Sequence, residues 1–437
     1  MILMAVLQPT DVYVIVNDAA QQMFGASAIK AVDTSSFVSV GQAMMNVGYE
    51  NTLNALSTAI GRTIFSERPY TGKFRLLTAD SMEYGAIVRK ISYFYDGFEK
   101  SQDWNTDLDN DQLADGASID PWTIRKRYPL EITFSGLKTL QKSFTHFRKQ
   151  LRVAFHNEEE FSRFYQGLLV EVANELQIKM EAENRLTALN MIGSLYNTGT
   201  DVMVVNLTKM FNEKNNSTYK TAQLLGSNLK EFLPFFISTI KWYVRQLTDI
   251  GTRFHLTPVK NNAQGQPMQL LRHTPLSDQR LLISSQFMID AEAQVLPQVF
   301  NDEYLKVSQA EYVNYWQNPA SPQAVSVTPT QLNVTTGLQE KGAAVQLDNV
   351  IGLLYDYRGL AVNYMMEDVL TTPVNARGDY YNTVYHWAKM YVNDPTENMV
   401  LFYMSDTDRD TTLSVCVPPY ECPDTNTDKP TSKMKKS

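Results

Sequence analysis

The sequence predicts an α+β fold, because one very long helical pattern stands among several short strand-like runs. Apolar residues recur at helical spacing between Asn157 and Tyr196, which predicts a helix roughly 55 Å long at 1.5 Å per residue. Val202–Val205 and Val350–Tyr355 are short apolar runs of the kind found in buried strands. No second helix of comparable length is expected, so the long helix is not expected to belong to a helical bundle.

The composition is that of a folded protein with large interfaces. Of 437 residues, 43% are hydrophobic and 20% are charged, which excludes a disordered chain. The 39 Lys and Arg against 47 Asp and Glu give a net charge of -8, which disfavours nucleic-acid binding across the whole surface. The 23 Tyr and 20 Phe suit extensive contacts with partners, because aromatic side chains provide large contact areas.

Cysteine use and hydropathy favour a soluble, non-secreted protein. Cys416 and Cys422 are too few for a disulfide scaffold or a cysteine-rich metal site, and they fit a reducing cytoplasm. The apolar N-terminus has no basic region before it, so no signal peptide is expected. The longest later apolar run, Phe232–Ile240, is interrupted by Pro234 and is too short to span a membrane.

Residues 1–66 are predicted to form an arm with two helical pieces. Asp11 precedes a helical pattern that ends at Gly25, and a second pattern carries apolar residues from Leu53 to Ile64. Neither piece is long enough to be stable alone, so both need a surface to pack on.

Residues 67–128 are predicted to be a long excursion from the body of the protein. Lys73–Ala79 and Tyr84–Tyr95 have strand composition and are separated by a turn-like segment, so we expect them to pair as a hairpin. Residues 101–120 then hold six Asp and no Lys or Arg, and a basic group follows at 125–127. A segment this polar contributes little to a core and is expected to be exposed.

The remaining elements follow in chain order. Strands are expected at Leu130–Phe134 and Leu151–Phe155, with a helical turn at Leu137–Ser143 between them. Further strands are expected at Leu281–Ser284, Gly359–Met365 and Met399–Met404. Two later helices are expected, one that begins at Pro234 and one that carries Tyr380, Val384, Trp387 and Met390.

No motif for catalysis or cofactor binding is present. The sequence contains no GxxxxGK[ST], GxGxxG, HExxH or GxSxG, and its five histidines show no metal-ligand spacing. Asp107, Asp109 and Asp111 resemble the start of a calcium loop, but Gln112 and Ser118 replace the Gly and Glu that such a loop requires. A solvated acidic loop is favoured over weak cation binding. We therefore expect no enzyme activity, no cofactor and no metal site.

Two further segments allow more than one interpretation. The basic residues Lys138, Lys142, Arg148, Lys149 and Arg152 favour a solvated strand edge over a face toward nucleic acid or an acidic neighbour. The segment VSVTPTQLNVTTG (325–337) is similar to a bacterial immunoglobulin-like strand pair. The strands that would complete such a sandwich are not evident after it.

Three segments resemble parts of the major capsid protein of tailed phages, which has the Hong Kong 97-type fold. LRVAFHNEEEFSRFYQGLLVEVANELQIKMEAENRLTALNMI (151–192) resembles the start of that family's spine helix. NVIGLLYDYRGLAV (349–362) resembles its strand–Asp–x–Arg–strand piece, and GDYYNTVYHWAKMYVNDPTENMVLF (378–402) resembles the last helix and strand of the small short-tailed phage branch. With the arm and the excursion, the resemblance covers residues 5–404.

The resemblance implies a division of the chain into six regions. These are an N-terminal arm (1–66), an extended loop (67–128), a peripheral domain with the spine helix (129–200), an axial domain (201–364), a returning part of the peripheral domain (365–404) and a flexible C-terminal tail (405–437). Lys73, Lys90 and Lys100 match, by position only, the lysine that some relatives cross-link to a neighbouring subunit.

The resemblance also implies a function. The chain would self-assemble, as pentamers and hexamers, into the icosahedral shell of a tailed bacteriophage. A separate scaffolding protein and a portal are expected, and the shell would enclose double-stranded DNA without sequence-specific binding or any membrane. The protein would be located in the virion after assembly in the host cytoplasm. The alternatives are an encapsulin-like nanocompartment shell and a phage tail or fibre protein.

Charged residues of the extended loop and of the strand–Asp–x–Arg–strand piece are the candidates for contacts between subunits. Opposite charges at the two ends of residues 101–127 could select the register between neighbouring copies. The candidate contact residues are Arg125, Lys126, Arg127, Asp107, Asp109, Asp356 and Arg358.

Overall fold

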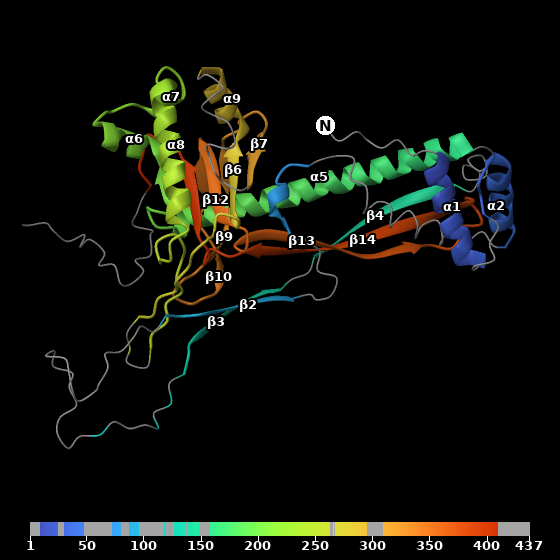
Figure 1. Ribbon diagram of the computed structural model, residues 1–437, viewed down its shortest axis with the longest axis horizontal. Coiled ribbons are helices and arrows are strands. Elements are labelled where there is room, and N and C mark those ends of the chain that lie inside the picture. Colours follow the sequence, from blue (N-terminus) through green and yellow to red (C-terminus); the bar gives the residue numbers. More distant parts are fainter. Residues whose placement is uncertain are drawn as a thin grey trace, which may run out of the picture. The chain divides into compact units, whose positions relative to one another are not determined.

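The structure is a computed structural model of the chain. It describes residues 9–24, 30–47, 72–79, 87–95, 118, 122, 124, 126–135, 138–147, 158–262, 265, 267–294 and 309–409. The chain forms two compact units. Unit 1 comprises Met1–Val88, Phe134–Thr187 and Ala361–Val392, and unit 2 comprises Arg89–Thr133, Ala188–Leu360 and Asn393–Ser437. Each unit combines helices with a sheet, which confirms the predicted α+β class (Figure 1).

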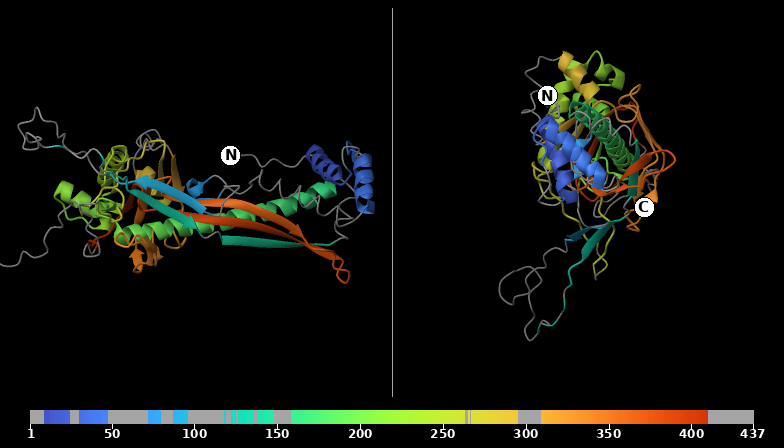
Figure 2. Two further views of the ribbon diagram at one scale, coloured as in Figure 1. Left: turned by 90° about the horizontal axis from the view of Figure 1, so that it is seen from below. Right: turned by 90° about the vertical axis from the view of Figure 1, so that its right-hand side faces the viewer.

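Two N-terminal helices of unit 1, α1 (Pro9–Phe24) and α2 (Thr34–Val47), lie side by side (Figure 2). Their contact buries apolar side chains such as Phe37, which neither helix could shield alone. The helix α1 confirms the first predicted helix, whereas α2 is not predicted by the sequence pattern. The second expected helix, around 53–64, lies outside the described residues.

The longest helix, α5 (Glu158–Thr198), confirms the predicted long helix. It contributes residues up to Thr187 to unit 1 and later residues to unit 2. The polar residues Glu181–Arg185 interrupt the apolar stripe of this helix, and they belong to unit 1. There the Asn184 amide donates to the Phe74 carbonyl over 3.1 Å and accepts from the Tyr364 hydroxyl over 2.8 Å. The break in the apolar pattern is therefore a buried polar contact and not a solvent-facing patch.

Unit 1 contains a four-stranded sheet in the order β1-β13-β14-β4. Strand β14 pairs antiparallel with β4 over ten residue pairs, from Tyr380↔Phe147 to Lys389↔Lys138, and β1 runs parallel to β13. The bounds are β1 (Thr78–Ala79), β13 (Leu360–Thr371), β14 (Tyr380–Asn393) and β4 (Lys138–Phe147).

Three expectations for unit 1 are wrong. The helix expected around Tyr380–Met390 is the strand β14, because its buried aromatic residues Tyr381, Tyr385 and Trp387 follow the two-residue period of a strand. Where the structure describes the helical turn expected at Leu137–Ser143, residues 138–143 are part of strand β4, and Leu137 lies outside the described residues. The hairpin expected between 73–79 and 84–95 does not form, because β1 pairs with β13 and β2 pairs with β3.

Unit 2 contains a five-stranded sheet in the order β5-β15-β12-β6-β7. Strand β12 pairs antiparallel with β15 and β6, and the outer strands β5 and β7 run parallel to their neighbours. These strands confirm the expected runs at 202–205, 281–284, 350–355 and 399–404. Their bounds are β5 (Val204–Asn206), β15 (Met399–Tyr403), β12 (Val350–Asp356), β6 (Gln279–Ser284) and β7 (Gln309–Val313).

Four helices of unit 2 accompany this sheet, and an aromatic-rich core lies among them. Phe232 and Phe236 of α8 pack with Phe287 of α9, with ring centroids 6.2 and 4.9 Å from it. The helix α8 begins five residues before the expected first residue, Pro234. Burial of its apolar face offsets the hydrogen bond that proline cannot donate. The bounds are α6 (Leu207–Asn215), α7 (Thr221–Leu225), α8 (Leu229–Gln246) and α9 (Ser285–Gln294).

Shorter pieces complete the described fold. Strands β2 (Ile87–Tyr93) and β3 (Pro129–Ser135) form a two-stranded sheet, called the hairpin below. Between residues 325 and 347, β8 (Val325–Val327) pairs with β11 (Val345–Leu347), and β9 (Thr330–Leu332) pairs with β10 (Gln339–Lys341). None of the described helices combines the length and hydropathy needed to cross a membrane.

The first residues of the expected flexible tail are held by unit 2. The Asp406 carboxylate accepts from the Thr221 amide over 2.6 Å. The Arg409 guanidinium donates to the carbonyls of Tyr196 and Gly199 over 3.0 and 2.7 Å. The expected tail therefore starts no earlier than residue 410, and Cys416 and Cys422 lie outside the described residues.

Candidate functional site

The two faces of strand β2 differ sharply in chemistry. Ile91 and Tyr93 point outward, with 54% and 59% of their surface exposed, although both are large apolar side chains. Lys90 and Ser92 alternate with them and point inward, as the two-residue period of a strand requires. The outward face thus exposes Ile91 and Tyr93 beside the Arg89–Glu131 ion pair, and the inward face turns Lys90, Ser92 and the buried Phe94 toward unit 2.

The far end of β2 packs on a loop of unit 2. Phe94 is buried with Met268 and Leu270, and Tyr128 and Leu130 pack against the same group. The next backbone amide, that of Tyr95, donates to the Gln269 carbonyl over 2.7 Å. This contact holds one end of the inward face against the loop that contains residues 268–272.

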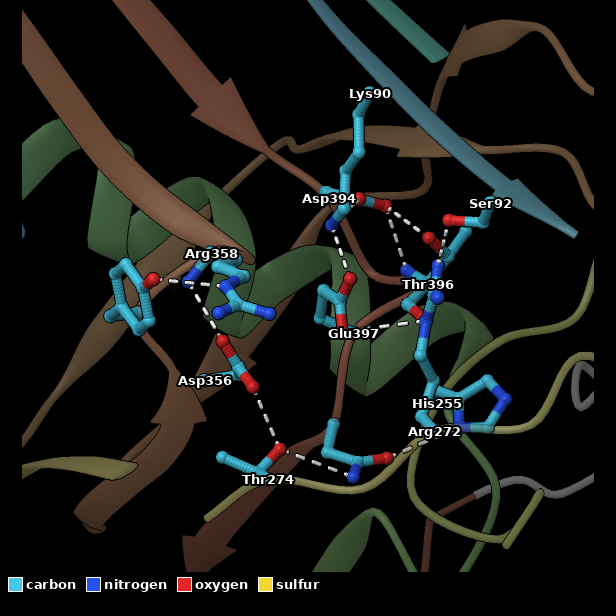
Figure 3. A network of polar contacts seen from close by, with 12 residues as sticks. Lys90, Ser92, His255, Arg272, Thr274, Asp356, Arg358, Asp394, Thr396 and Glu397 are labelled. Carbon is cyan, nitrogen blue, oxygen red and sulfur yellow. Dashed lines mark hydrogen bonds and ion pairs between the residues drawn. The ribbon is translucent and has the colours of Figure 1, made fainter. Parts of the chain in front are cut away.

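Four charged side chains, which we call the ion cluster, hold the middle of the inward face (Figure 3). The Lys90 ammonium lies 2.7 Å from Asp394 Oδ2 and also contacts Glu397, and Arg272 Nε lies 3.4 Å from the second oxygen of Glu397. The side chains of Asp394 and Glu397 are 1% and 7% exposed. Two cations therefore balance two buried carboxylates.

The carboxylates of the ion cluster are placed by a tight buried turn between β14 and β15. Asp394 Oδ1 accepts from the backbone amide and the hydroxyl of Thr396, over 2.9 and 2.7 Å, and so closes the turn on itself. The Asp394 amide donates to the Gly359 carbonyl over 2.7 Å. A Cβ at residue 359 would lie only 3.0 Å from the Glu397 Cβ, so glycine permits this close approach.

A chain of hydrogen bonds lies beside the ion cluster (Figure 3). The Asp356 carboxylate accepts from the Thr274 hydroxyl over 2.8 Å, and the Asn398 amide group lies 3.2 Å from that hydroxyl. His255 then bridges Asn398 and the Leu270 carbonyl, at 3.1 and 2.8 Å from its two ring nitrogens. Burial raises the pKa of Asp356 and lowers the pKa of His255, so burial favours the neutral form of both groups.

The expected contact residues Asp356 and Arg358 occupy different environments. Asp356 is buried and accepts a hydrogen bond from the Arg358 amide over 2.8 Å, which shapes the turn between β12 and β13. The Arg358 guanidinium is more than half exposed, donates to the Tyr357 hydroxyl over 2.9 Å and lies 3.6 Å from Asp278. The two residues form no ion pair with each other. Arg358 is the member of the pair that could contact a neighbour.

The other expected contact residues lie in the extended loop. Lys126 and Arg127 are exposed, and Arg125, Asp107 and Asp109 lie outside the described residues. Trp122 and Ile124, just before the basic group, are more than four-fifths exposed, a feature that the sequence reasoning missed. The presence of a tryptophan beside a strongly acidic segment could have indicated these exposed apolar side chains. Among the described residues, no group of three His, Cys, Asp or Glu side chains could hold a metal ion.

A comparison of the chain with protein families gives one match. The family model described as "Phi29-like phage major capsid protein" matches residues 13–403. No curated protein sequence matches the chain.

Several solved capsid structures are similar at low identity. The capsid of Staphylococcus phage Andhra gives a TM-score of 0.46 at 11% identity, covering 76% of this chain and 84% of that chain. The capsid of the cyanophage P-SCSP1u gives 0.38 at 10% identity, with 78% and 90% covered. The capsid of Myoviridae phage XM1 gives 0.34 at 11% identity, with 77% and 94% covered.

Proposed function

Since the chain belongs to the Phi29-like phage major capsid protein family, we propose that its copies build an icosahedral shell of pentamers and hexamers in which each hairpin lies on a neighbouring copy. The protein is a major capsid protein and forms the shell of a phage virion. Its long helix, its two sheets and its hairpin are the elements expected of the Hong Kong 97-type capsid fold.

The exposure of Ile91 and Tyr93 on the hairpin is the observation that supports this contact. A two-stranded sheet is marginally stable alone, and Ile91 and Tyr93 lie on the side opposite the ion cluster. A buried aromatic side chain removes 150 to 250 Å² from water as a rough figure, so exposed aromatic residues on a protruding element favour a partner. In a shell of identical subunits, that partner is a second copy of this chain.

The regions of the chain follow from this proposal, with two adjustments. Residues 1–66 serve as the arm, 67–128 as the extended loop, 129–200 with part of 365–404 as the peripheral domain, and 201–364 as the axial domain. The pairing of β15 with β5 and β12 supports assigning the residues after 392 to the axial domain. The contacts of Asp406 and Arg409 support a tail that starts at residue 410.

The partners follow from the same proposal. The shell encloses double-stranded DNA without sequence-specific binding, and the net charge of -8 supports weak contact with phosphate. A separate scaffolding protein and a portal direct assembly in the host cytoplasm. Exposed Arg358, Lys126 and Arg127, together with Arg125, Asp107 and Asp109, select the register between copies, and Asp356 positions Arg358 through the turn. The absence of catalytic motifs in the sequence supports a purely structural role.

Electron microscopy of the purified full-length protein tests the contact. We expect Ile91→Asp with Tyr93→Asp to leave the circular dichroism spectrum unchanged and to abolish shells, because two charges cannot be buried against a neighbour without partners. Leu338→Asp is the matched control, since this exposed leucine lies far along the chain from the hairpin. Shells of normal shape from the double variant would contradict the proposed contact.

A further inference from the structure

We infer that Lys90 is a positioning residue that fixes the direction of the hairpin in the free subunit, before any neighbour is present. The inference rests on the proposed function, because it concerns the element that is proposed to contact the neighbour. The ion cluster orients the hairpin in advance, so assembly does not have to order the hairpin.

The four charges of the ion cluster come from segments that lie far apart in the chain. Arg272, Asp394 and Glu397 come from the loop before β6 and from the turn between β14 and β15, whereas Lys90 comes from the hairpin. The cluster is neutral only when Lys90 is present. If the hairpin swung away, two buried carboxylates would keep a single cation, and an uncompensated buried charge is strongly unfavourable.

Asp394 and Glu397 both have partners other than Lys90. Thr396 donates twice to Asp394, and Arg272 pairs with Glu397. Both carboxylates of the turn therefore have partners that do not come from the hairpin. The turn does not need Lys90 in order to adopt its shape. The hairpin needs the turn, because a lysine that points inward from a strand is costly unless its charge is paired.

A second polar contact on the same face supports the inference. The Arg272 guanidinium donates to the Ser92 hydroxyl over 2.9 Å and to the Thr396 carbonyl over 3.0 Å. Ser92 lies two residues after Lys90 and so points to the same side of β2. Arg272 thereby joins the hairpin to the turn (Figure 3). Phe94, two residues after Ser92, is buried against Met268 and Leu270 and adds an apolar contact on the same face.

A hairpin that is oriented in advance lowers the cost of assembly. Ordering a mobile segment at an interface opposes binding, and a segment already held in its bound direction avoids that cost. The outward face with Ile91 and Tyr93 would then be presented in one direction by every copy. Because a shell repeats the contact in each subunit, a small gain per contact has a large effect on closure.

Hydrogen exchange in the unassembled full-length subunit tests this inference. We expect Lys90→Met, which keeps the aliphatic stem and removes the charge, to speed amide exchange in residues 88–93 and 129–134 at least tenfold. Exchange in β12 and β15 should stay unchanged. The protein concentration needed for shells should rise severalfold, and Lys90→Arg should restore both properties to a large extent.

A paired variant separates positioning from folding. Lys90→Met with Glu397→Gln removes one charge of each sign and leaves Arg272 and Asp394 as the charged members, so the cluster stays neutral and the variant should fold even if Lys90→Met alone does not. Its hairpin should still exchange rapidly. Unchanged hairpin exchange in these variants, or equal loss of protection in β12 and β15, would overturn the inference. Failure of the wild-type protein to form shells even together with its scaffolding protein would instead overturn the proposed function, and the exchange comparison would still report on Lys90.

Discussion

In unit 2, every residue of β12 and β15 is buried, whereas in unit 1 the residues of β14 mostly alternate between buried and half-buried positions. A strand that is buried on both faces appears in the sequence as an unbroken apolar run, and both such strands are predicted correctly. A strand that is buried on one face carries polar residues at every second position. In β14, the apolar residues between Tyr380 and Met390 also fit a helical spacing, which explains the wrong prediction.

The buried charges of the two units differ in their partners. In unit 1, Glu183 of α5 contacts Lys389 and accepts from the Tyr391 hydroxyl over 2.6 Å, and both partners lie on β14. Burial alone would raise the pKa of Glu183, but hydrogen bonds from Lys389, Tyr391 and Lys179 outweigh burial and bring the pKa down to about 2. This group joins a helix to a central strand. The ion cluster of unit 2 instead joins the hairpin, the element that we propose contacts a neighbouring copy, to the turn between β14 and β15.

The largest expected effect on stability concerns the fully buried sheet. Leu354→Ala in β12 should lower the free energy of unfolding by about 3 kcal/mol, because a Leu→Ala change in a core loses buried surface and leaves a cavity. Val384→Ala in β14, where the side chain is half-buried, should cost less than about 1 kcal/mol. Urea unfolding of the unassembled subunit measures both. Equal costs would show that the two sheets are equally well packed.

A smaller effect concerns His146 of β4, which stacks on Tyr381 of β14 with ring centroids 4.9 Å apart. Burial lowers the pKa of His146 from 6.5 to about 4. Below pH 6.5 the unfolded chain takes up a proton that the folded chain does not, so stability falls as the pH drops toward 4. The loss from this group at pH 5 should be about 2 kcal/mol relative to pH 7.

The variant His146→Phe tests the pH dependence. It keeps a ring for the stack and removes the titrating group, so its stability should fall less between pH 7 and pH 5 than that of the wild type. Burial also lowers the pKa of His255, so part of the pH dependence should remain in the variant. Thermal unfolding at the two pH values gives the comparison. The same loss in both proteins would mean that His146 is protonated in the fold.

The smallest expected effect on the fold concerns the charges of the extended loop, of which Lys126 and Arg127 are described and exposed. Reversal of Arg125, Lys126 and Arg127 to Glu should leave unfolding unchanged, because exposed pairs contribute at most about 1 kcal/mol each. Closure of shells should nevertheless fail, since every subunit repeats the altered contact. Asp107→Ala with Asp109→Ala should act in the same direction more weakly. Circular dichroism and electron microscopy over a range of salt concentrations separate the two effects, and normal assembly of the triple variant would mean that these charges are simply solvated.

Part of the candidate site could be predicted from the sequence. The strand–Asp–x–Arg–strand piece indicates a shaped turn, and the structure places Asp356 inside that turn with Arg358 at its surface. Asp394 and Glu397 give no comparable signal, because a Pro-containing polar segment usually predicts an exposed turn. Distant segments bury it: the Leu256 amide donates to the Pro395 carbonyl, the Asp394 amide donates to the Gly359 carbonyl, and Lys90 and Arg272 contact the two carboxylates.

The sequence by itself determined the long helix α5 and the buried strands β5, β6, β12 and β15, because in these elements the local apolar pattern and the final burial coincide. The tertiary structure alone decided the pairing of β1 with β13, of β2 with β3, and of β14 with β4. It also decided that Lys90 pairs with Asp394, which is 304 residues further along the chain. Strand pairing and ion pairing depend on which segments meet in space. A local pattern of residues records which face of an element is apolar, but not which distant segment covers it.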